Sequence, residues 1–367
     1  MNYAENILSA VCAVGKAYQI LIKTDIEALV YVEIAGKKYH SHSNGIKISS
    51  AGMHKISVPQ RELDEACGYT LSITPVIDRA PYYPKLGEET RRDVLFKPLK
   101  KSEGINICHL SDVHGLKEPA LAVARKEQID LLILNGDISS TSNTYEAMFL
   151  CYELASELTR GEIPCIISRG NHDLRGYEAE NLAKIMPTDQ GRSYYTFRVG
   201  CVWGILVDAG EDKPDGSCEY NGVICCEDFR REEDAAIRRV IENARDEYAK
   251  EDVKYKLVVS HIPFPFKREN PFDIERELYA SWGKLLRENV KPELMLCGHT
   301  HNYGVNPVGA YLDDLGQPCT VVVGSDVKTS GDDTVYSSAF ITLENDTASI
   351  RLYNANGMVS KEEINIR

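Results

Sequence analysis

The segment INICHLSDVH at residues 105–114 joins an apolar run directly to a group of polar side chains. The same arrangement recurs in LLILNGD at residues 131–137 and in CIISRGNHD at residues 165–173. Helical patterns at residues 120–127 and 144–159 separate these apolar runs. Strands that alternate with helices in this way predict a layered α/β domain.

Two further apolar runs end in polar residues later in the chain. His261 follows one of them, and the motif GHTH at residues 298–301 follows the other. Helical patterns at residues 237–248 and 274–286 precede these runs. In open α/β sheets ligands bind beyond the carboxyl ends of the strands. We therefore expect five strands to deliver their polar side chains to one edge of a sheet.

The polar residues at these strand ends are two aspartates, an asparagine and four histidines. They are Asp112, His114, Asp137, Asn171, His261, His299 and His301. Oxygen and imidazole ligands together suit manganese, iron or zinc better than magnesium or calcium. Seven ligands are too many for one ion, so the set predicts two divalent ions that share a bridging carboxylate. Glycines at positions 136, 170 and 298 lack a Cβ, which allows the backbone to approach the ions closely.

The first part of the chain follows a different pattern. Residues 17–97 contain short stretches in which apolar and polar residues alternate, and residues 79–101 are rich in proline and charge. Short alternating strands with turn residues between them indicate an antiparallel sandwich. We therefore expect residues 1–100 to form a small all-β domain with a linker, and residues 101–367 to form the α/β domain.

Composition restricts the partners and the compartment. The 42 basic and 55 acidic side chains give a net charge of −13, and a surface so acidic disfavours extended DNA or RNA as a substrate. No apolar stretch is long enough to cross a bilayer, and the N-terminus lacks the basic region of a signal peptide. The eleven cysteines form no CxxC pair, which suits free thiols in a reducing compartment. We therefore expect a cytoplasmic protein without a membrane segment.

The order of the motifs resembles that of the calcineurin-like metallophosphoesterase superfamily over residues 104–330. The motifs are Asp-x-His, Gly-Asp, Gly-Asn-His-Asp, a lone histidine and Gly-His-x-His. The resemblance implies a four-layer αββα sandwich with a dinuclear metal site at the strand ends, so that residues 101–367 are the catalytic domain. The preceding region is similar in position to the immunoglobulin- or fibronectin-like domain of purple acid phosphatases.

The resemblance also assigns roles to single residues. It divides the ligands into Asp112, His114 and His301 for one metal, Asn171, His261 and His299 for the other, and Asp137 as the bridge. A hydroxide between the ions would attack phosphorus. His172 is similar to the acid that protonates the leaving oxygen. Arg169 and Asn171 would bind the phosphoryl group, as an arginine in this position does in some protein phosphatases.

Two departures from the family pattern follow the predicted bridging residue Asp137. Purple acid phosphatases carry a tyrosine three residues after it, and this chain has Ser140 there. We therefore expect no purple iron(III) centre. Members of the family often have a further acidic residue after the Gly-Asp motif that supports the catalytic histidine. The next residues here are Ile138 and Ser139, so the sequence does not identify the partner of His172.

These residues predict a two-metal hydrolase of phosphate monoesters or diesters that acts on a small phosphate ester. A different hypothesis is a metal-bearing scaffold that binds a partner without catalysis, and the complete ligand set argues against it. A nuclease is a third hypothesis, which the net charge of −13 and the lack of a basic, aromatic-lined stripe disfavour. The sequence does not decide among manganese, iron and zinc. It also leaves the substrate and the oligomeric state open.

Overall fold

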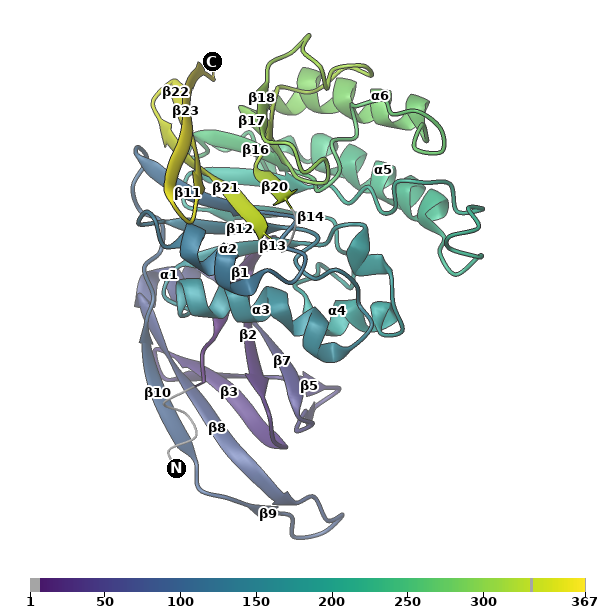
Figure 1. The fold of residues 1–367 in the computed structure, drawn as a ribbon. Helices are drawn as coiled ribbons and strands as arrows, with labels where there is room; N and C mark the ends of the chain where they lie inside the picture. The colour runs from purple at the N-terminus through teal and green to yellow at the C-terminus, as the bar shows by residue number, and fades with distance from the viewer. Residues whose placement is uncertain (1–6, 331–332, 367) are drawn as a thin grey trace.

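The computed structural model describes residues 7–330 and 333–366. Two large β-sheets pack face to face, and helices cover the outer face of each sheet (Figure 1). This arrangement is the four-layer αββα sandwich predicted from the sequence, and a β-rich region precedes it in the chain.

The first sheet has ten strands, and parallel pairs lie at its centre. In spatial order they are β23 (Gly357–Asn365), β22 (Thr347–Asn354), β21 (Asp333–Glu344), β11 (Ile105–Leu110), β12 (Leu131–Asn135), β13 (Pro164–Ser168), β1 (Ala10–Val14), β2 (Ala17–Thr24) and β7 (Gly52–Pro59), with β20 (Ser325–Ser330) paired to β21. Strands β11, β12 and β13 pair in parallel, with Leu132 opposite Cys165. Every residue of β12 and β13 is buried, because both faces of a central parallel strand are covered.

The second sheet has six strands, most of them parallel. They are β14 (Tyr195–Val199), β15 (Val202–Leu206), β16 (Tyr255–Val259), β17 (Leu294–Cys297), β19 (Thr320–Val323) and β18 (Gly304–Asn306). The core between the two sheets contains Ile107 and Ile133 from the first and Leu257 and Leu296 from the second, all fully buried. This shared core holds the two sheets, and therefore the ends of their strands, in a fixed relation.

Helices form the two outer layers of the sandwich. They are α2 (Lys117–Ala124), α3 (Tyr145–Thr159) and α4 (Leu182–Ile185) over the first sheet, and α5 (Cys226–Glu242) and α6 (Arg276–Leu285) over the second. The helix predicted at residues 144–159 is present, and the Thr144 side chain caps it by accepting a hydrogen bond from the backbone N of Ala147. The helix predicted at residues 120–127 begins and ends three residues earlier.

Several short helical segments complete the fold. They are α1 (Gln60–Ala66), the 3-10 turns η1 (His172–Leu174), η2 (Ala179–Asn181) and η3 (Ala244–Asp246), and the π turn η4 (Leu286–Val290). Among the residues that the structure describes, no helix has the length and apolar character needed to cross a membrane.

The N-terminal strands are divided between the first sheet and smaller sheets of their own. Strand β1 pairs in parallel with β13, with Cys12 opposite Cys165, and β2 and β7 extend the sheet beyond it. A separate five-stranded sheet lies below them in Figure 1. It consists of β10 (Thr90–Leu95), β8 (Gly68–Asp78), β3 (Ala28–Ile34), β4 (Lys37–His40) and β9 (Lys85–Leu86), and β5 (His42–Ser43) pairs only with β6 (Ile46–Lys47).

The linker predicted at residues 79–101 is only partly correct. Strands β9 and β10 lie within it and pair with β8. Strand β10 lies at the edge of its sheet, and its sequence TRRDVL carries the charged side chains that edge strands commonly expose. The division of the chain at residue 100 stays a prediction, although strands from both sides of it share the first sheet and one apolar core.

Candidate active site

The polar residues predicted at the strand ends meet at one edge of the sandwich. Asp112, Asp137 and Asn171 follow β11, β12 and β13 of the first sheet. His261 and residues 299–301 follow β16 and β17 of the second sheet. The sequence predicted the edge of a single sheet, whereas the ligands come from two, because the packed sheets bring the carboxyl ends of their parallel strands together.

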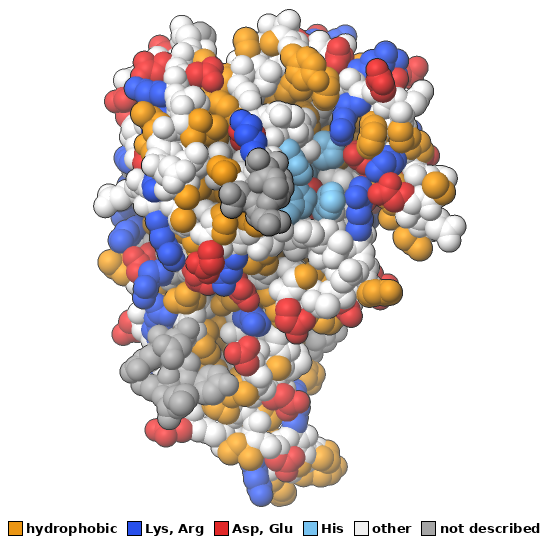
Figure 2. Space-filling view, viewed as in Figure 1, with side chains coloured by type: hydrophobic (Ala, Val, Ile, Leu, Met, Phe, Trp, Pro, Cys, Tyr) orange, Lys and Arg blue, Asp and Glu red, His pale blue; other side chains and the backbone are white. Residues whose placement is uncertain are grey.

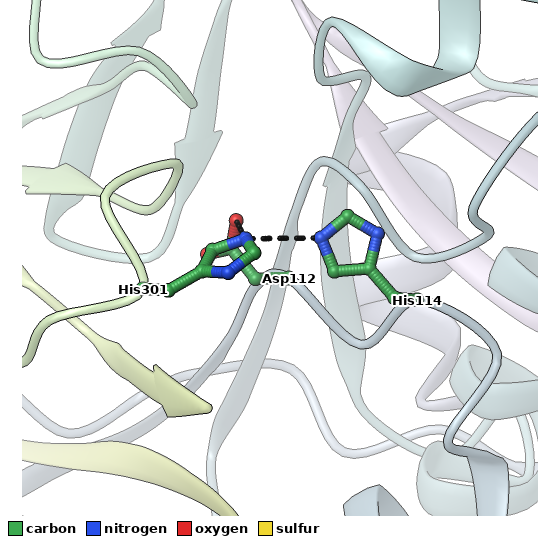
Figure 3. Close-up of side chains that lie close together, drawn as sticks. All are labelled: Asp112, His114 and His301. Carbon is green, nitrogen blue, oxygen red and sulfur yellow. Dashed lines mark hydrogen bonds and ion pairs between the residues drawn. The ribbon is translucent and has the colours of Figure 1, made fainter. Parts of the chain in front are cut away.

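Asp112, His114 and His301 form the first cluster of possible metal ligands (Figure 3). Nε2 of His301 lies 3.3 Å from Oδ1 of Asp112 and 3.1 Å from Nε2 of His114. Figure 3 shows the two imidazole rings reaching toward each other from separate loops, with the aspartate beside them. One ligand atom from each residue lies within 4.8 Å of the others, a spacing that suits a shared ion.

Asp137, His261 and His299 form a second cluster of the same kind. Nε2 of His261 lies 3.1 Å from Oδ2 of Asp137. Oδ1 of Asn171 lies 3.0 Å from Nδ1 of His299, which adds the amide oxygen to this cluster. All of the predicted ligands therefore lie in two neighbouring groups.

Asp137 lies between the two clusters. Its Oδ2 is 3.1 Å from Nε2 of His261 in one cluster and 3.9 Å from Nε2 of His114 in the other. Its Oδ1 accepts a hydrogen bond of 2.9 Å from the backbone N of His172, which fixes the carboxylate plane. A carboxylate in this position is able to bridge two ions.

The His261 side chain fits a metal ligand better than a structural histidine. It is 3% exposed, and its Nδ1 lies 2.7 Å from the carbonyl oxygen of Asn135. A carbonyl only accepts hydrogen bonds, so Nδ1 carries a proton and Nε2 is the atom that faces the two aspartates. This Nε2 is buried and has no hydrogen-bond partner. Histidine ligands of metals commonly donate a hydrogen bond from their other ring nitrogen to a carbonyl, which orients the ring.

The two aspartates make the site strongly attractive to cations. Burial alone lowers the pKa of His261, but Asp137 and Asp112 raise it, to about 10 in balance. Burial alone raises the pKa of Asp112, and His261 and His301 hold it well below its usual range. Two ionised carboxylates in a buried site favour bound positive charge, whether it comes from protons or from metal ions.

Several of the ligand candidates hold a strained backbone. The residues with left-handed φ angles are Asp112 (53°), His114 (46°), Asp137 (53°), His299 (69°) and His301 (54°). Residues other than glycine rarely adopt this conformation, which costs on the order of 1–3 kcal/mol each. Such strain persists only where the surrounding structure enforces it, and it concentrates at functional sites.

Gly136 shows why a glycine precedes a ligand. Its φ is 78°, and a Cβ there would lie 2.6 Å from the backbone N of Gly170 and 2.7 Å from Cγ of His261. Any larger residue would force apart the loops that follow β12, β13 and β16. Glycine at this position therefore allows the three loops to converge.

Asp173 ties two of these loops together. Its Oδ2 accepts hydrogen bonds from the backbone N of Gly170 at 2.7 Å and of Asp137 at 3.2 Å. Burial and the nearby charge of Asp137 raise the pKa of Asp173 to about 7. The last residue of the Gly-Asn-His-Asp motif thus shapes the backbone beside the ligands.

His172 stands at the solvent side of the ligand clusters, with 33% of its side chain exposed. Its Nδ1 lies 3.0 Å from the carbonyl oxygen of Ser140, and its Nε2 lies 4.0 Å from Oδ2 of Asp137. Because the carbonyl only accepts, Nδ1 carries a proton and Nε2 faces the site. The partner of His172 that the sequence did not identify is thus a backbone carbonyl.

Arg169 lies beside the site but is engaged elsewhere. Its Nε donates a hydrogen bond to Oδ2 of Asp208, whose side chain is 4% exposed, and its guanidinium lies 4.9 Å from the centre of the Phe229 ring. These contacts engage its Nε and one face of its guanidinium. Its predicted contact with a phosphoryl oxygen stays a prediction.

Two charged residues that the sequence analysis missed contact His299. Its Nε2 lies 3.4 Å from Oδ2 of Asp212 and 2.7 Å from Nη1 of Arg268. Burial alone raises the pKa of Asp212, but His299 and Lys213 hold it well below its usual range. Both residues lie in loops that carry no recognisable motif, so no signal in the sequence marks them.

Basic side chains border the histidines on the surface. Figure 2 shows the histidines in a hollow with lysine and arginine side chains beside them. Three basic side chains surround the Asp212 carboxylate, which lies 3.4 Å from Lys213, 3.5 Å from Arg268 and 3.7 Å from Arg175. Arg175 and Lys213 also pair with Glu211 and Glu219, so Arg268 is the cation that directly contacts a ligand candidate, His299.

Comparisons with known proteins identify the family and the fold. Residues 105–303 match the family described as calcineurin-like phosphoesterase. The fold is similar to a purple acid phosphatase from yellow lupin (Lupinus luteus) seeds, with a TM-score of 0.56 and 12% identity over 98% of this chain and 74% of that one. Chaetomium thermophilum Vps29 matches 72% of this chain and 100% of its own at 11% identity and a TM-score of 0.32. The curated proteins contain no match.

Proposed function

The chain belongs to the calcineurin-like phosphoesterase family, and from this premise we propose that it hydrolyses phosphate monoesters or diesters at a two-metal centre. The observation that carries the proposal is the pair of ligand clusters with Asp137 between them, 3.1 Å from His261 on one side and 3.9 Å from His114 on the other.

The ligands divide between the ions as the clusters do. Asp112, His114 and His301 would hold the first ion, Asn171, His261 and His299 the second, with Asp137 shared. Bound there, two divalent ions would activate a water molecule and neutralise charge on the phosphoryl oxygens. The mixed oxygen and imidazole donors favour manganese, iron or zinc. Ser140, in place of a tyrosine, argues against a purple iron centre.

His172 is the proposed general acid. Its Nδ1 is engaged by Ser140, so Nε2 is the atom that would carry a proton to the departing oxygen. The partial exposure of the ring leaves room for a leaving group in front of it.

Asn171 and Arg169 are the proposed contacts to the phosphoryl group. Asn171 is 2% exposed, and its Oδ1 faces His299, so it serves best as a ligand that also borders the substrate. For Arg169 to grip an oxygen of the substrate, its guanidinium would have to turn away from Asp208. Its present contacts support a role in positioning the loop that carries Asn171.

The substrate and compartment complete the proposal. A small phosphate ester can reach Arg268 beside His299, whereas the net charge of −13 would repel an extended nucleic acid. A cytoplasmic location is supported by the free cysteines, most of which are buried, because free thiols persist in a reducing compartment.

Hydrolysis of p-nitrophenyl phosphate and bis-p-nitrophenyl phosphate with added manganese tests the proposal. We expect turnover of at least one ester, with two ions bound per chain by metal analysis. Asp137→Ala should lose both ions and all turnover. His42→Ala, on the exposed strand β5, is the matched control and should change neither.

Two rival functions give different outcomes. A metal-bearing scaffold would bind two ions and turn over neither ester. A nuclease would cleave single- or double-stranded DNA faster than bis-p-nitrophenyl phosphate. Either result would replace the proposed function.

A further inference from the structure

A groove of about 620 Å³ is lined by Arg268, Thr300, Tyr303, Asn306 and Tyr311. None of the ligand candidates lines it, but Thr300 lies between His299 and His301 in the chain, so the groove borders the ligand loop. Its volume falls within the range of 300–1,000 Å³ that is usual for small-molecule sites.

Arg268 links the groove to the proposed reaction centre. Its Nη1 lies 2.7 Å from Nε2 of His299, and a third of its side chain is exposed. A small pocket of about 20 Å³ against His299 shares Lys267 and Arg268 with the groove. The groove is therefore continuous with the site and has a guanidinium at the junction, where a phosphate would lie.

Tyr311 supplies a flat apolar surface in the groove. One side of its ring packs on Phe266, with 4.9 Å between the ring centres, yet the residue is 75% exposed. An aromatic side chain supported on one side and open on the other is a platform on which a planar ring stacks. Asn302 and Asn306 add amide groups to the same groove, which suits a ligand with hydroxyl or carbonyl groups.

The other large cavities lack this combination. A cavity of about 760 Å³ under α5 is lined by Glu232, Glu233 and Glu247 and shares no residue with the small pocket against His299. A cavity of about 380 Å³ contains Phe229, but the guanidinium of Arg169 covers that ring. Of these three cavities, the groove alone joins an exposed aromatic surface to Arg268, which contacts His299.

We propose that this groove holds the organic group of the substrate, and that this group is a planar aromatic ring on a polar, nucleoside-sized linker. The phosphate of such a nucleotide would lie between the metal ions and Arg268, and its ring would stack on Tyr311. This inference rests on the proposed function, because it places the phosphate at the two-metal centre.

Binding to the full-length, metal-loaded His172→Ala protein, in which hydrolysis should be slow, tests the groove without requiring turnover. Titration calorimetry compares thymidine 5′-monophosphate, phenyl phosphate and inorganic phosphate. We expect the nucleotide to bind most tightly of the three. Tyr311→Ala should weaken nucleotide binding by about tenfold or more and should change the affinity for inorganic phosphate far less. Tyr311→Phe keeps the ring and should retain the affinity. Tyr83→Ala, also at an exposed tyrosine but remote on the β8–β9 connection, should leave the nucleotide affinity unchanged.

Each other outcome overturns a distinct part of the inference. If the nucleotide binds no more tightly than phosphate, or if Tyr311→Ala weakens both equally, the groove does not hold the organic group. If phenyl phosphate binds as tightly as the nucleotide, the groove recognises the aromatic ring alone, and the linker adds nothing to the affinity. Both results leave the proposed function standing when the nitrophenyl esters are hydrolysed. If phosphate itself does not bind and no ester is hydrolysed, the proposed function fails and the groove assignment fails with it.

Discussion

Replacing Asp212 with asparagine tests whether residues outside the motifs build the metal site. The Asp212 carboxylate is buried and lies 3.4 Å from Nε2 of His299, while Nδ1 of the same ring faces Asn171 at 3.0 Å. In this structure Nε2 accepts from Nη1 of Arg268, 2.7 Å away. If Nδ1 binds the ion, its proton must pass to Nε2, which then donates to Asp212 in place of accepting from Arg268. The carboxylate would then fix the ring and raise its basicity as a ligand. Asparagine keeps the shape of the side chain and removes the charge.

The expected loss follows from the geometry. Outer carboxylate partners of histidine ligands typically contribute about 10–100-fold in metal affinity, or ~1.4–2.7 kcal/mol. The 3.4 Å separation is longer than the 2.7–3.2 Å of an ordinary N–H···O hydrogen bond. We therefore expect Asp212→Asn to weaken binding of the second ion by about tenfold, the lower end of this range. Binding of the first ion should change little, because Asp112, His114 and His301 do not contact Asp212.

Calorimetric titration of the metal-free protein with Mn²⁺ measures both affinities. Glu219→Gln is the matched control: it removes one negative charge that pairs with Lys213 at 2.9 Å and Arg175 at 3.4 Å, two cations that Asp212 also holds. We expect this control to bind both ions normally. The reasoning is refuted if Asp212→Asn binds the second ion within twofold of the unaltered protein, or if both variants weaken it equally.

Four further outcomes follow from the structure. His172→Ala should lower kcat by about 10²–10⁴-fold while metal analysis still finds both ions, whereas full rate would remove His172 as the acid. Saturation with Mn²⁺ at 100 times its Kd should raise the free energy of unfolding by about 2.7 kcal/mol for each ion bound, and EDTA should reverse this in urea titrations. Arg169→Ala should cost about 3–5 kcal/mol of stability, because the buried Asp208 would lose its cation and keep only the neutral donors of Ser193 and Gly210. An unchanged urea midpoint would contradict this. Burial lowers the pKa of His109 to about 4, because the buried site disfavours the protonated ring. The neutral ring therefore contributes fully to stability above about pH 6.5, and this contribution is lost as the pH falls toward 4. His109→Gln should therefore reduce the difference in unfolding free energy between pH 7 and pH 4 by up to ~3 kcal/mol.

Local patterns in the sequence were enough to predict the central strands that lead to the site. Strands β12 and β13 are short and mostly apolar, with Asn135 and Ser168 at their ends, and turn residues bound them. The helix predicted at residues 237–248 was less accurate, because α5 begins at Cys226 and ends at Glu242. Helix α3 begins one residue after the predicted start at Thr144, where a side-chain cap ends the preceding loop. These signals depend on residues only a few positions apart, which is why they are visible without the structure.

The arrangement of the N-terminal region was not predictable in the same way. The sequence indicated short strands there, and the structure confirms β-rich character. The pairing of β1 with β13 joins Cys12 to a position 153 residues later. No local pattern encodes such a partner. The pairing provides hydrogen-bond partners for the edge of β13, which would otherwise be open to another chain.

The sequence by itself determined which residues are available as metal ligands. The residue types and their spacing at strand ends sufficed, because a ligand must follow directly from the strand that positions it. The family resemblance already implied two groups of ligands with Asp137 between them. Only the tertiary structure decided that two sheets rather than one supply these groups. It alone brought Asp212, Arg268 and Tyr311 to the same edge. These residues lie in loops whose positions depend on packing against distant segments, so their contacts with the site exist only once the two sheets have joined.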